Sequence, residues 1–204
     1  MKNQNHSTHL RSLIKGAILI AAAALSIGSL QAKDYQLADH EIRWTGSMPA
    51  KTHEGKLTLK SIEADITDTG KVTSLKAVVD MTAINVTDLE GKSRDKLTGH
   101  LESDDFFHVE KYPTATFVLD EHKNDKFHGT LTIRGVSKKV ALPAKVSGHP
   151  DRGWMLVGDF DYNRNDFGVD YQNSGLLGFM NAAKSKLINE LIDVSVSVTL
   201  KPKA

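Results

Sequence analysis

Histidines are the side chains of this sequence that could hold a metal or move a proton. A metal site needs ligands at short spacing, such as His-x-x-x-His on a helix or His-x-His on a strand. After residue 32 no two histidines have that spacing, and the nearest pair, His122 and His128, flanks an expected turn. The pattern therefore favours scattered histidines, and we expect no metal and no cofactor. His53, close to Gly55, is the histidine that we expect could touch the polar head group of a ligand.

Acidic and nucleophilic residues give no catalytic pattern either. Three acids cluster in the segment 99–105, where capping and solvation at a helix–strand junction would explain them. The sequence has no cysteine, no GxSxG elbow and no HExxH motif. The letters DFG at 166–168 lack the Gly-rich loop and HRD segment of a kinase. We therefore predict that the protein is not an enzyme.

Arg164 and Asp166 lie two residues apart, so that on a strand they would share one face. A structural ion pair or hydrogen bonds at the end of the barrel would explain this spacing. The alternative is that Arg164 meets the head group of a ligand.

The elements that must position these groups are strands, because the dominant period of the sequence is two. Between Ile192 and Leu200 apolar residues alternate with polar ones, which is typical of a strand with one buried face. Leu89–Ser103 and Asn181–Glu190 break the period and are expected to be short helices. The expected strands cover residues 35–44, 55–66, 75–81, 114–122, 127–133, 140–146, 154–162 and 192–200.

Eight strands joined mostly by short turns predict an all-β fold, an antiparallel eight-stranded barrel with one or two short helices. Closure of the sheet removes exposed strand edges. A barrel of this size is either filled by side chains or holds one small ligand. A β-sandwich is the alternative.

The first 32 residues have the pattern of a secretory signal peptide. Three basic residues, Lys2, Arg11 and Lys15, accompany the uncharged run Gly16–Gly28, and a cut is expected near Ala32. The run is shorter than the ~20 residues that span a bilayer, although an uncleaved anchor is the alternative. We expect a periplasmic protein whose residues 33–204 form one domain without a membrane span. This domain has 23 basic and 25 acidic residues, which does not suggest a nucleic-acid surface.

Four segments carry a resemblance to a known family: WTGSMPAKTHEGKL at 44–57, SDDFFHVEKYPTATF at 103–117, GTLTIRGVSKKVALP at 129–143 and RNDFGVD at 164–170. The sequence resembles the YceI-like family, also called polyisoprenoid-binding or lipocalin-like periplasmic proteins. The resemblance implies a lipocalin-like barrel with an elongated apolar interior. It also implies a carrier that binds an amphiphilic lipid such as an isoprenoid quinone, and it leaves room for a homodimer.

Large apolar residues on the expected inward faces are candidates to line that interior. A solid core is the alternative. Phe106 and Phe107 are adjacent, and on a strand they would face opposite sides. The candidate ligand-binding residues are Trp44, His53, Phe106, Phe117, Phe127, Leu131, Ile133, Phe160 and Arg164.

Two other functions stay open. One is an enzyme, hydrolytic or metal-dependent, that uses histidine and acidic residues at one end of the barrel. The other is a stress-linked module that binds a partner through the apolar cluster Leu176, Leu177, Phe179 and Met180.

Overall fold

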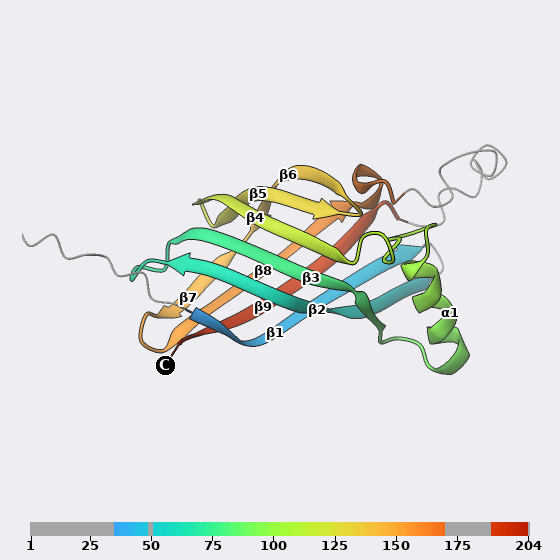
Figure 1. Ribbon diagram of the computed structural model, residues 1–204, viewed down its shortest axis with the longest axis horizontal. Coiled ribbons are helices and arrows are strands. Elements are labelled where there is room, and N and C mark those ends of the chain that lie inside the picture. The colour runs from blue at the N-terminus through green and yellow to red at the C-terminus, as the bar shows by residue number, and fades with distance from the viewer. Residues whose placement is uncertain (1–34, 49–50, 170–188, 204) are drawn as a thin grey trace, which may run out of the picture. The chain divides into compact units, whose positions relative to one another are not determined.

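The computed structural model describes residues 35–48, 51–169 and 189–203. This part of the chain is mostly strand, with one α-helix and one short 3-10 helix, η1 (Figure 1). The elements are β1 (Tyr35–Met48), β2 (Lys51–Ile66), β3 (Val72–Val86), α1 (Gly91–Glu102), β4 (Thr114–Lys123), β5 (Lys126–Ile133), β6 (Val136–Pro143), β7 (Lys145–His149), β8 (Gly153–Asn163), η1 (Arg164–Phe167) and β9 (Leu191–Pro202).

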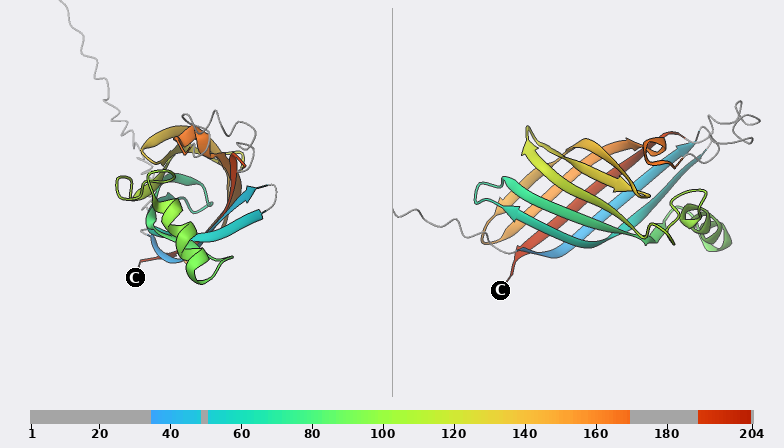
Figure 2. Two further views of the ribbon diagram at one scale, coloured as in Figure 1. Left: turned by 90° about the vertical axis from the view of Figure 1, so that its right-hand side faces the viewer. Right: turned by 45° about the horizontal axis from the view of Figure 1, so that its top comes forward.

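The strands form a single antiparallel sheet in the order β6-β5-β4-β3-β2-β1-β9-β8-β7. The sheet curls around a central axis, as the left view of Figure 2 shows. The first and last strands are neighbours within it, since Tyr35 of β1 pairs with Pro202 of β9. The predicted antiparallel, lipocalin-like barrel is confirmed.

The sheet has nine strands where the sequence predicted eight, because the strand expected at 140–146 is divided. β6 pairs with β5, and β7 pairs with β8. The division falls at Ala144, whose N–H donates to Asp125 O over 2.9 Å instead of to a neighbouring strand. At this point the chain passes close to β8, where a Cβ on Gly158 would lie 2.3 Å from Pro143 O. The break therefore carries the chain from one edge of the sheet to the other.

Alternation of residue types decides which face of each strand is buried. Along β5 the buried residues are Phe127, Gly129, Leu131 and Ile133, and the residues between them are less buried. Because side chains on a strand point alternately to opposite faces, one face of β5 meets the interior. Burial of apolar surface stabilises this arrangement by about 25 cal/mol per Å².

Two-residue turns join the strands β4, β5 and β6. Asn124 and Asp125 both have φ of 53°, and Arg134 and Gly135 have φ of 50° and 74°. Positive φ at both central residues is the geometry of the type I′ turn, whose twist matches that of the flanking strands. Both turns lie in the gaps between the expected strands 114–122, 127–133 and 140–146.

The helix predicted at Leu89–Ser103 is confirmed as α1, which buries Leu101. The second predicted helix, at Asn181–Glu190, lies outside the described residues except for its last two positions. Of these, Asn189 donates its N–H to Ser47 O over 2.7 Å.

Two aromatic rings lie against glycines of neighbouring strands. Trp44 pairs directly with Gly55, and a Cβ on Gly55 would lie 2.5 Å from two atoms of the indole ring. Likewise, a Cβ on Gly129 would lie 2.6 Å from Phe117 Cζ. Each glycine leaves the space that the neighbouring ring occupies.

We therefore expect Gly55→Ala to destabilise the protein, because the new methyl would also lie 2.3 Å from Asn85 O. The free energy of unfolding should fall by about 2 kcal/mol, as measured by urea denaturation. Gly99→Ala is the matched control, since a Cβ there meets nothing within 4 Å. An equal loss in the two variants would contradict the role given to Gly55.

Candidate ligand-binding cavity

The barrel contains a partly open cavity of about 470 Å³ that is lined mainly by apolar side chains. Its lining residues come from α1, from every strand except β7, from the turns between α1 and β4, and from Ala144 between β6 and β7. Along β3 the lining runs from Leu75 to Ile84, which at ~3.3 Å per residue is about 30 Å. The volume falls within the range of small-molecule sites, roughly 300–1,000 Å³. The interior is thus an elongated apolar space and not a solid core.

Eight of the nine predicted ligand-binding residues line this cavity. They come from strands far apart in the sequence, which the curled sheet brings around one space. Contact with a ligand stays a prediction for each of them. The eight are Trp44, His53, Phe106, Phe117, Phe127, Leu131, Ile133 and Phe160.

The expectation that Phe106 and Phe107 face opposite sides of a strand is wrong, because these residues lie in turns between α1 and β4. The turns are held by Phe106 N donating to Ser103 O at 3.1 Å and Phe107 N donating to Leu101 O at 3.0 Å. The two rings meet edge to face, with centroids 5.1 Å apart. Because the two residues do not lie on a strand, their side chains need not point to opposite faces, and both rings line the cavity.

Arg164 is the predicted site residue that does not line the cavity. It begins η1, so the strand face that it was expected to share with Asp166 does not exist. Its side chain is 1% exposed. Nη1 donates to Val169 O over 2.5 Å and Nε donates to Asn189 O over 3.4 Å. The guanidinium thus joins the segment after β8 to the start of β9.

A second arginine, which sequence reasoning missed, connects three of the segments that carry the family resemblance. Arg134 donates from Nη2 to Asp104 O over 2.7 Å and from Nη1 to Gly168 O. In the same region a Cβ on Gly135 would lie 2.6 Å from Tyr112 Cε1. These residues hold the turn after α1, the β5–β6 turn and the end of η1 together, which is a structural role.

A histidine–carboxylate pair lies at the end of the cavity near α1. His53 Nδ1 lies 2.8 Å from Asp88 Oδ2, and Glu54 N–H donates to Asp88 Oδ1 over 3.0 Å. Partial burial pushes the pKa of Asp88 upward, but these two hydrogen bonds hold it below its usual value. Asp88 was also missed from the sequence, because it lies 35 residues from His53 and no local spacing connects them.

Further polar groups lie in or beside the wall at the same end of the cavity. Trp44 Nε1 is buried and has no hydrogen-bond partner among the described residues. Burial raises the pKa of the Tyr162 hydroxyl well above its usual value. His100 reaches the cavity from α1 and meets Phe106 edge to face, with ring centroids 5.7 Å apart. The cavity therefore combines an apolar length with polar groups at one end.

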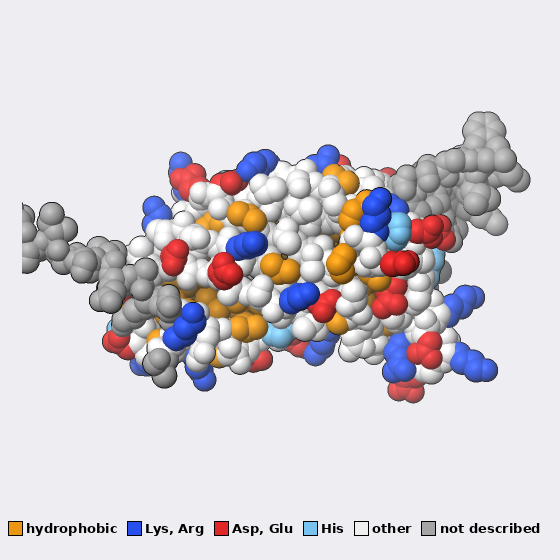
Figure 3. Space-filling model, in the orientation of Figure 1, with side chains coloured by type: hydrophobic (Ala, Val, Ile, Leu, Met, Phe, Trp, Pro, Cys, Tyr) orange, Lys and Arg blue, Asp and Glu red, His pale blue; other side chains and the backbone are white. Residues whose placement is uncertain are grey.

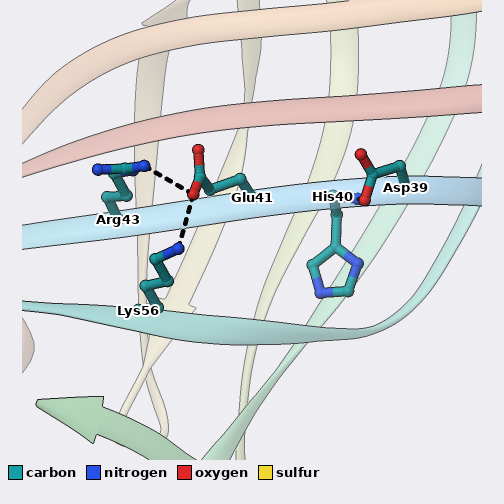
Figure 4. A network of polar contacts seen from close by, with 5 residues as sticks. All are labelled: Asp39, His40, Glu41, Arg43 and Lys56. Atoms are coloured by element: carbon teal, nitrogen blue, oxygen red, sulfur yellow. Dashed lines mark hydrogen bonds and ion pairs between the residues drawn. The ribbon is translucent and has the colours of Figure 1, made fainter. Parts of the chain in front are cut away.

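The outer wall carries its own ion pairs. Glu41 Oε1 lies 2.8 Å from both Arg43 Nη2 and Lys56 Nζ (Figure 4). The hydrogen bonds from Arg43 and Lys56 lower the pKa of Glu41 to about 2. Figure 3 shows charged side chains of both signs dispersed over the face in view. This surface is a solvated wall.

Within the described ranges, no three histidine, cysteine or acidic side chains gather closely enough to hold a metal ion. No helix in those ranges is long and apolar enough to cross a membrane. The apolar cluster at 176–180 that motivated a partner-binding module lies outside the described residues.

The family model described as the YceI-like domain matches residues 30–200. The chain belongs to the YceI-like family. The match includes all four segments that carry the resemblance, and also Arg134 and the His53–Asp88 pair.

Curated relatives in the YceI-like group match over shorter segments. A protein named YceI from Escherichia coli is 43% identical over 77 residues, which are 35% of this chain and 39% of the relative. A UPF0312 protein of Pseudomonas aeruginosa is 37% identical over 94 residues, which are 42% of this chain and 48% of the relative. Each match spans less than half of the relative's length.

Solved structures show the same YceI-like fold at low sequence identity. BcnA of Burkholderia cenocepacia has a TM-score of 0.61 and 16% identity, over 78% of this chain and 95% of that one. A polyisoprenoid binding domain from Saccharophagus degradans has a TM-score of 0.58 and 14% identity, over 84% and 99% of the two chains. The YCEI protein of Campylobacter jejuni has a TM-score of 0.55 and 21% identity, with both chains covered in full.

The His53–Asp88 pair predicts a dependence of stability on pH. The folded-state pKa of Asp88 lies below its ordinary value of 3.8, so its contribution is complete above that value and is lost as the pH falls through the folded pKa. The unfolding free energy of the wild type should fall on going from pH 6 to pH 3, partly because Asp88 becomes protonated. The Asp88→Asn variant lacks this contribution, so its unfolding free energy should fall less over the same range, by up to about 1 kcal/mol. Urea denaturation at both pH values measures this difference.

Asp68→Asn, in the exposed turn between β2 and β3, controls for the general effect of removing one acid. If the two variants lose the same stability between the two pH values, Asp88 has no special contribution.

Proposed function

We propose that this YceI-like protein is a periplasmic binding or carrier protein for an amphiphilic, isoprenoid-type lipid such as an isoprenoid quinone. The lipid would lie in the barrel interior, and no catalysis is involved. The observation that carries this proposal is the elongated apolar cavity of about 470 Å³ with its polar groups at one end.

The physics of such binding requires no reactive group. An apolar tail that leaves water for the cavity gains about 25 cal/mol for each Å² of surface buried. A few polar groups suffice to orient the head.

The ligand class is also supported by the solved polyisoprenoid binding domain that shares this fold. At 14% identity that likeness carries the fold alone. The isoprenoid ligand, the periplasmic location expected from the leader and the absence of a cofactor are therefore parts of the proposal.

Native mass spectrometry tests the proposal directly. Protein purified from its native compartment should carry a co-purified lipid, and delipidated protein should regain one molecule after incubation with an isoprenoid lipid extract. The same spectra report whether the protein is a monomer or a homodimer. Protein that stays empty under both conditions would show that the cavity is not a lipid site.

Filling the cavity should block binding without unfolding the barrel. Ala77 lines the cavity on β3, so the ring introduced by Ala77→Phe would occupy ligand space. We expect at least a tenfold loss of lipid affinity in a fluorescent-lipid displacement assay. Unfolding free energy should be unchanged or higher, because the ring fills empty apolar volume.

Val118→Phe is the matched control, since Val118 is 42% exposed and follows Phe117, the cross-strand partner of Ala77. It should bind lipid as the wild type does. Unchanged lipid binding by a folded Ala77→Phe variant would place the ligand elsewhere.

A further inference from the structure

We infer that His53, oriented by Asp88, recognises the ligand's head as a hydrogen-bond acceptor, and that the head therefore carries a hydroxyl group. Isoprenoid alcohols and the reduced, hydroquinone forms of isoprenoid quinones share this chemistry, whereas the carbonyl oxygens of an oxidised quinone can only accept. The inference rests on the proposed function and adds to it the residue that recognises the head, the residue that positions it and the kind of head that they select.

The direction of the hydrogen bond between His53 and Asp88 is fixed. Asp88 Oδ1 accepts the N–H of Glu54 over 3.0 Å, and Oδ2 lies 2.8 Å from His53 Nδ1. Burial raises the pKa of Asp88, but these hydrogen bonds outweigh it and hold the pKa below its usual value, so at neutral pH the carboxylate has no proton to donate. His53 Nδ1 must carry the proton, and the uncharged imidazole then has a bare Nε2 that can only accept.

Nε2 of His53 is accessible to a bound molecule. His53 lines the cavity, and its side chain is 14% exposed. Nε2 has no hydrogen-bond partner among the described residues. Within the same ranges, Trp44 Nε1 is the only side-chain nitrogen or oxygen that is both fully buried and without a partner. Nε2 is therefore unpaired but not sealed off, so an atom of a ligand can contact it.

The strand register leaves space beside His53. His53 of β2 lies opposite Gly46 of β1, Gly46 lies opposite Ile192 of β9, and Ile192 lies opposite Tyr162 of β8. Since directly paired residues point to the same face, these four form one row across the wall, and all four line the cavity. Gly46 has no side chain, and even a Cβ there would lie 3.6 Å from Ile192 Cδ1, which is an ordinary contact. The row thus has room for a small head next to His53.

Tyr162 complements His53 in this row. Burial raises the pKa of its hydroxyl well above the usual value, so the hydroxyl keeps its proton and can donate it to a hydrogen bond. A hydroxyl group on a ligand both donates and accepts. Such a head can donate to His53 Nε2, and its oxygen can accept from a donor such as Tyr162.

The charges at this end favour a neutral head. No lysine or arginine is among the described residues that line the cavity. An anionic head would lie near the carboxylate of Asp88 without such a side chain in the lining to balance it, and an unbalanced charge is costly to desolvate. A hydroxyl group needs no cation.

The test compares ligands of equal tail length in two matched pairs, an isoprenoid alcohol with the plain hydrocarbon and an isoprenoid hydroquinone with its quinone, at about pH 8 and without oxygen. His53→Phe keeps an aromatic ring and removes both ring nitrogens. It should weaken the alcohol about fivefold more than the hydrocarbon, and the hydroquinone about fivefold more than the quinone, which is the size of one hydrogen bond. Differences in solubility and tail packing cancel, because each ratio compares the same ligands on two proteins.

Asp88→Asn should reverse the imidazole. The amide oxygen can replace Oδ1 as the acceptor for the N–H of Glu54, which turns the amide NH₂ toward His53. Nδ1 then accepts, and Nε2 carries the proton. Quinone affinity relative to the hydrocarbon should rise about fivefold in this variant, because a carbonyl oxygen can now accept from Nε2. If Asp88 had only a structural role, its replacement would weaken all four ligands alike.

A second readout needs no affinity measurement. Long-range ¹H–¹⁵N spectra of imidazole rings distinguish a bare ring nitrogen from a protonated one, and the signals of His53 are those lost in His53→Phe. The bare nitrogen should be Nε2 in the wild type and Nδ1 in Asp88→Asn. Addition of the alcohol to the wild type should shift the Nε2 signal, and addition of the hydrocarbon should not.

The outcomes separate the two proposals. If no ligand binds the wild type, the proposed function fails and this inference fails with it. If the ligands bind but His53→Phe weakens all of them alike, or if Nε2 of the wild type carries a proton, the acceptor role of His53 is overturned while lipid binding stands. Tighter binding of a polyisoprenyl phosphate than of the alcohol would overturn the neutral head. Of the alcohol and the hydroquinone, the one that loses more affinity in His53→Phe identifies the source of the hydroxyl group.

Discussion

The cavity depends on two aromatic rings that lie against the barrel wall. Trp44 and Phe117 occupy space that side chains at Gly55 and Gly129 would otherwise fill. Interiors of folded proteins are normally close-packed, with few voids larger than a water molecule. Here two large inward side chains are accommodated by glycines in the neighbouring strands, which leaves more of the central space free. The same contact that shapes the wall also fixes the direction of the indole of Trp44.

Because the centre of the barrel is a cavity, side-chain packing there stabilises the wall less than a filled core would. Hydrogen bonds between the segments at the barrel end therefore matter for stability. At the α1 end two guanidinium groups supply them. Arg134 joins the turn after α1 to the end of η1, and Arg164 joins the segment after η1 to the start of β9. Both donate to backbone carbonyls, which are fixed acceptors in these turns. The sequence segments typical of the family thus hold the barrel end together, and the wall residues beside them line the cavity.

The strands, the turns and most of the lining could be predicted because they follow from a local pattern. Alternation in β5 is enough to place Phe127, Leu131 and Ile133 on the inner face. What the sequence could not provide is register between strands and the geometry of irregular segments. Asp88 meets His53 through the pairing of β2 with β3, and Arg164 turns inward because η1 interrupts the strand period. Phe106 and Phe107 were misplaced for the same reason.

The pairing of β1 with β9 has a consequence for how the barrel forms. The two hairpins formed by β4, β5 and β6 involve residues close in sequence and can form early, because short loops have a small closure entropy. Tyr35 and Pro202, however, must meet across nearly the whole domain. Contacts of such high sequence separation are slow to form. Without β9 the sheet is interrupted between β1 and β8, so the pairing of β9 determines when the wall around the apolar interior is complete.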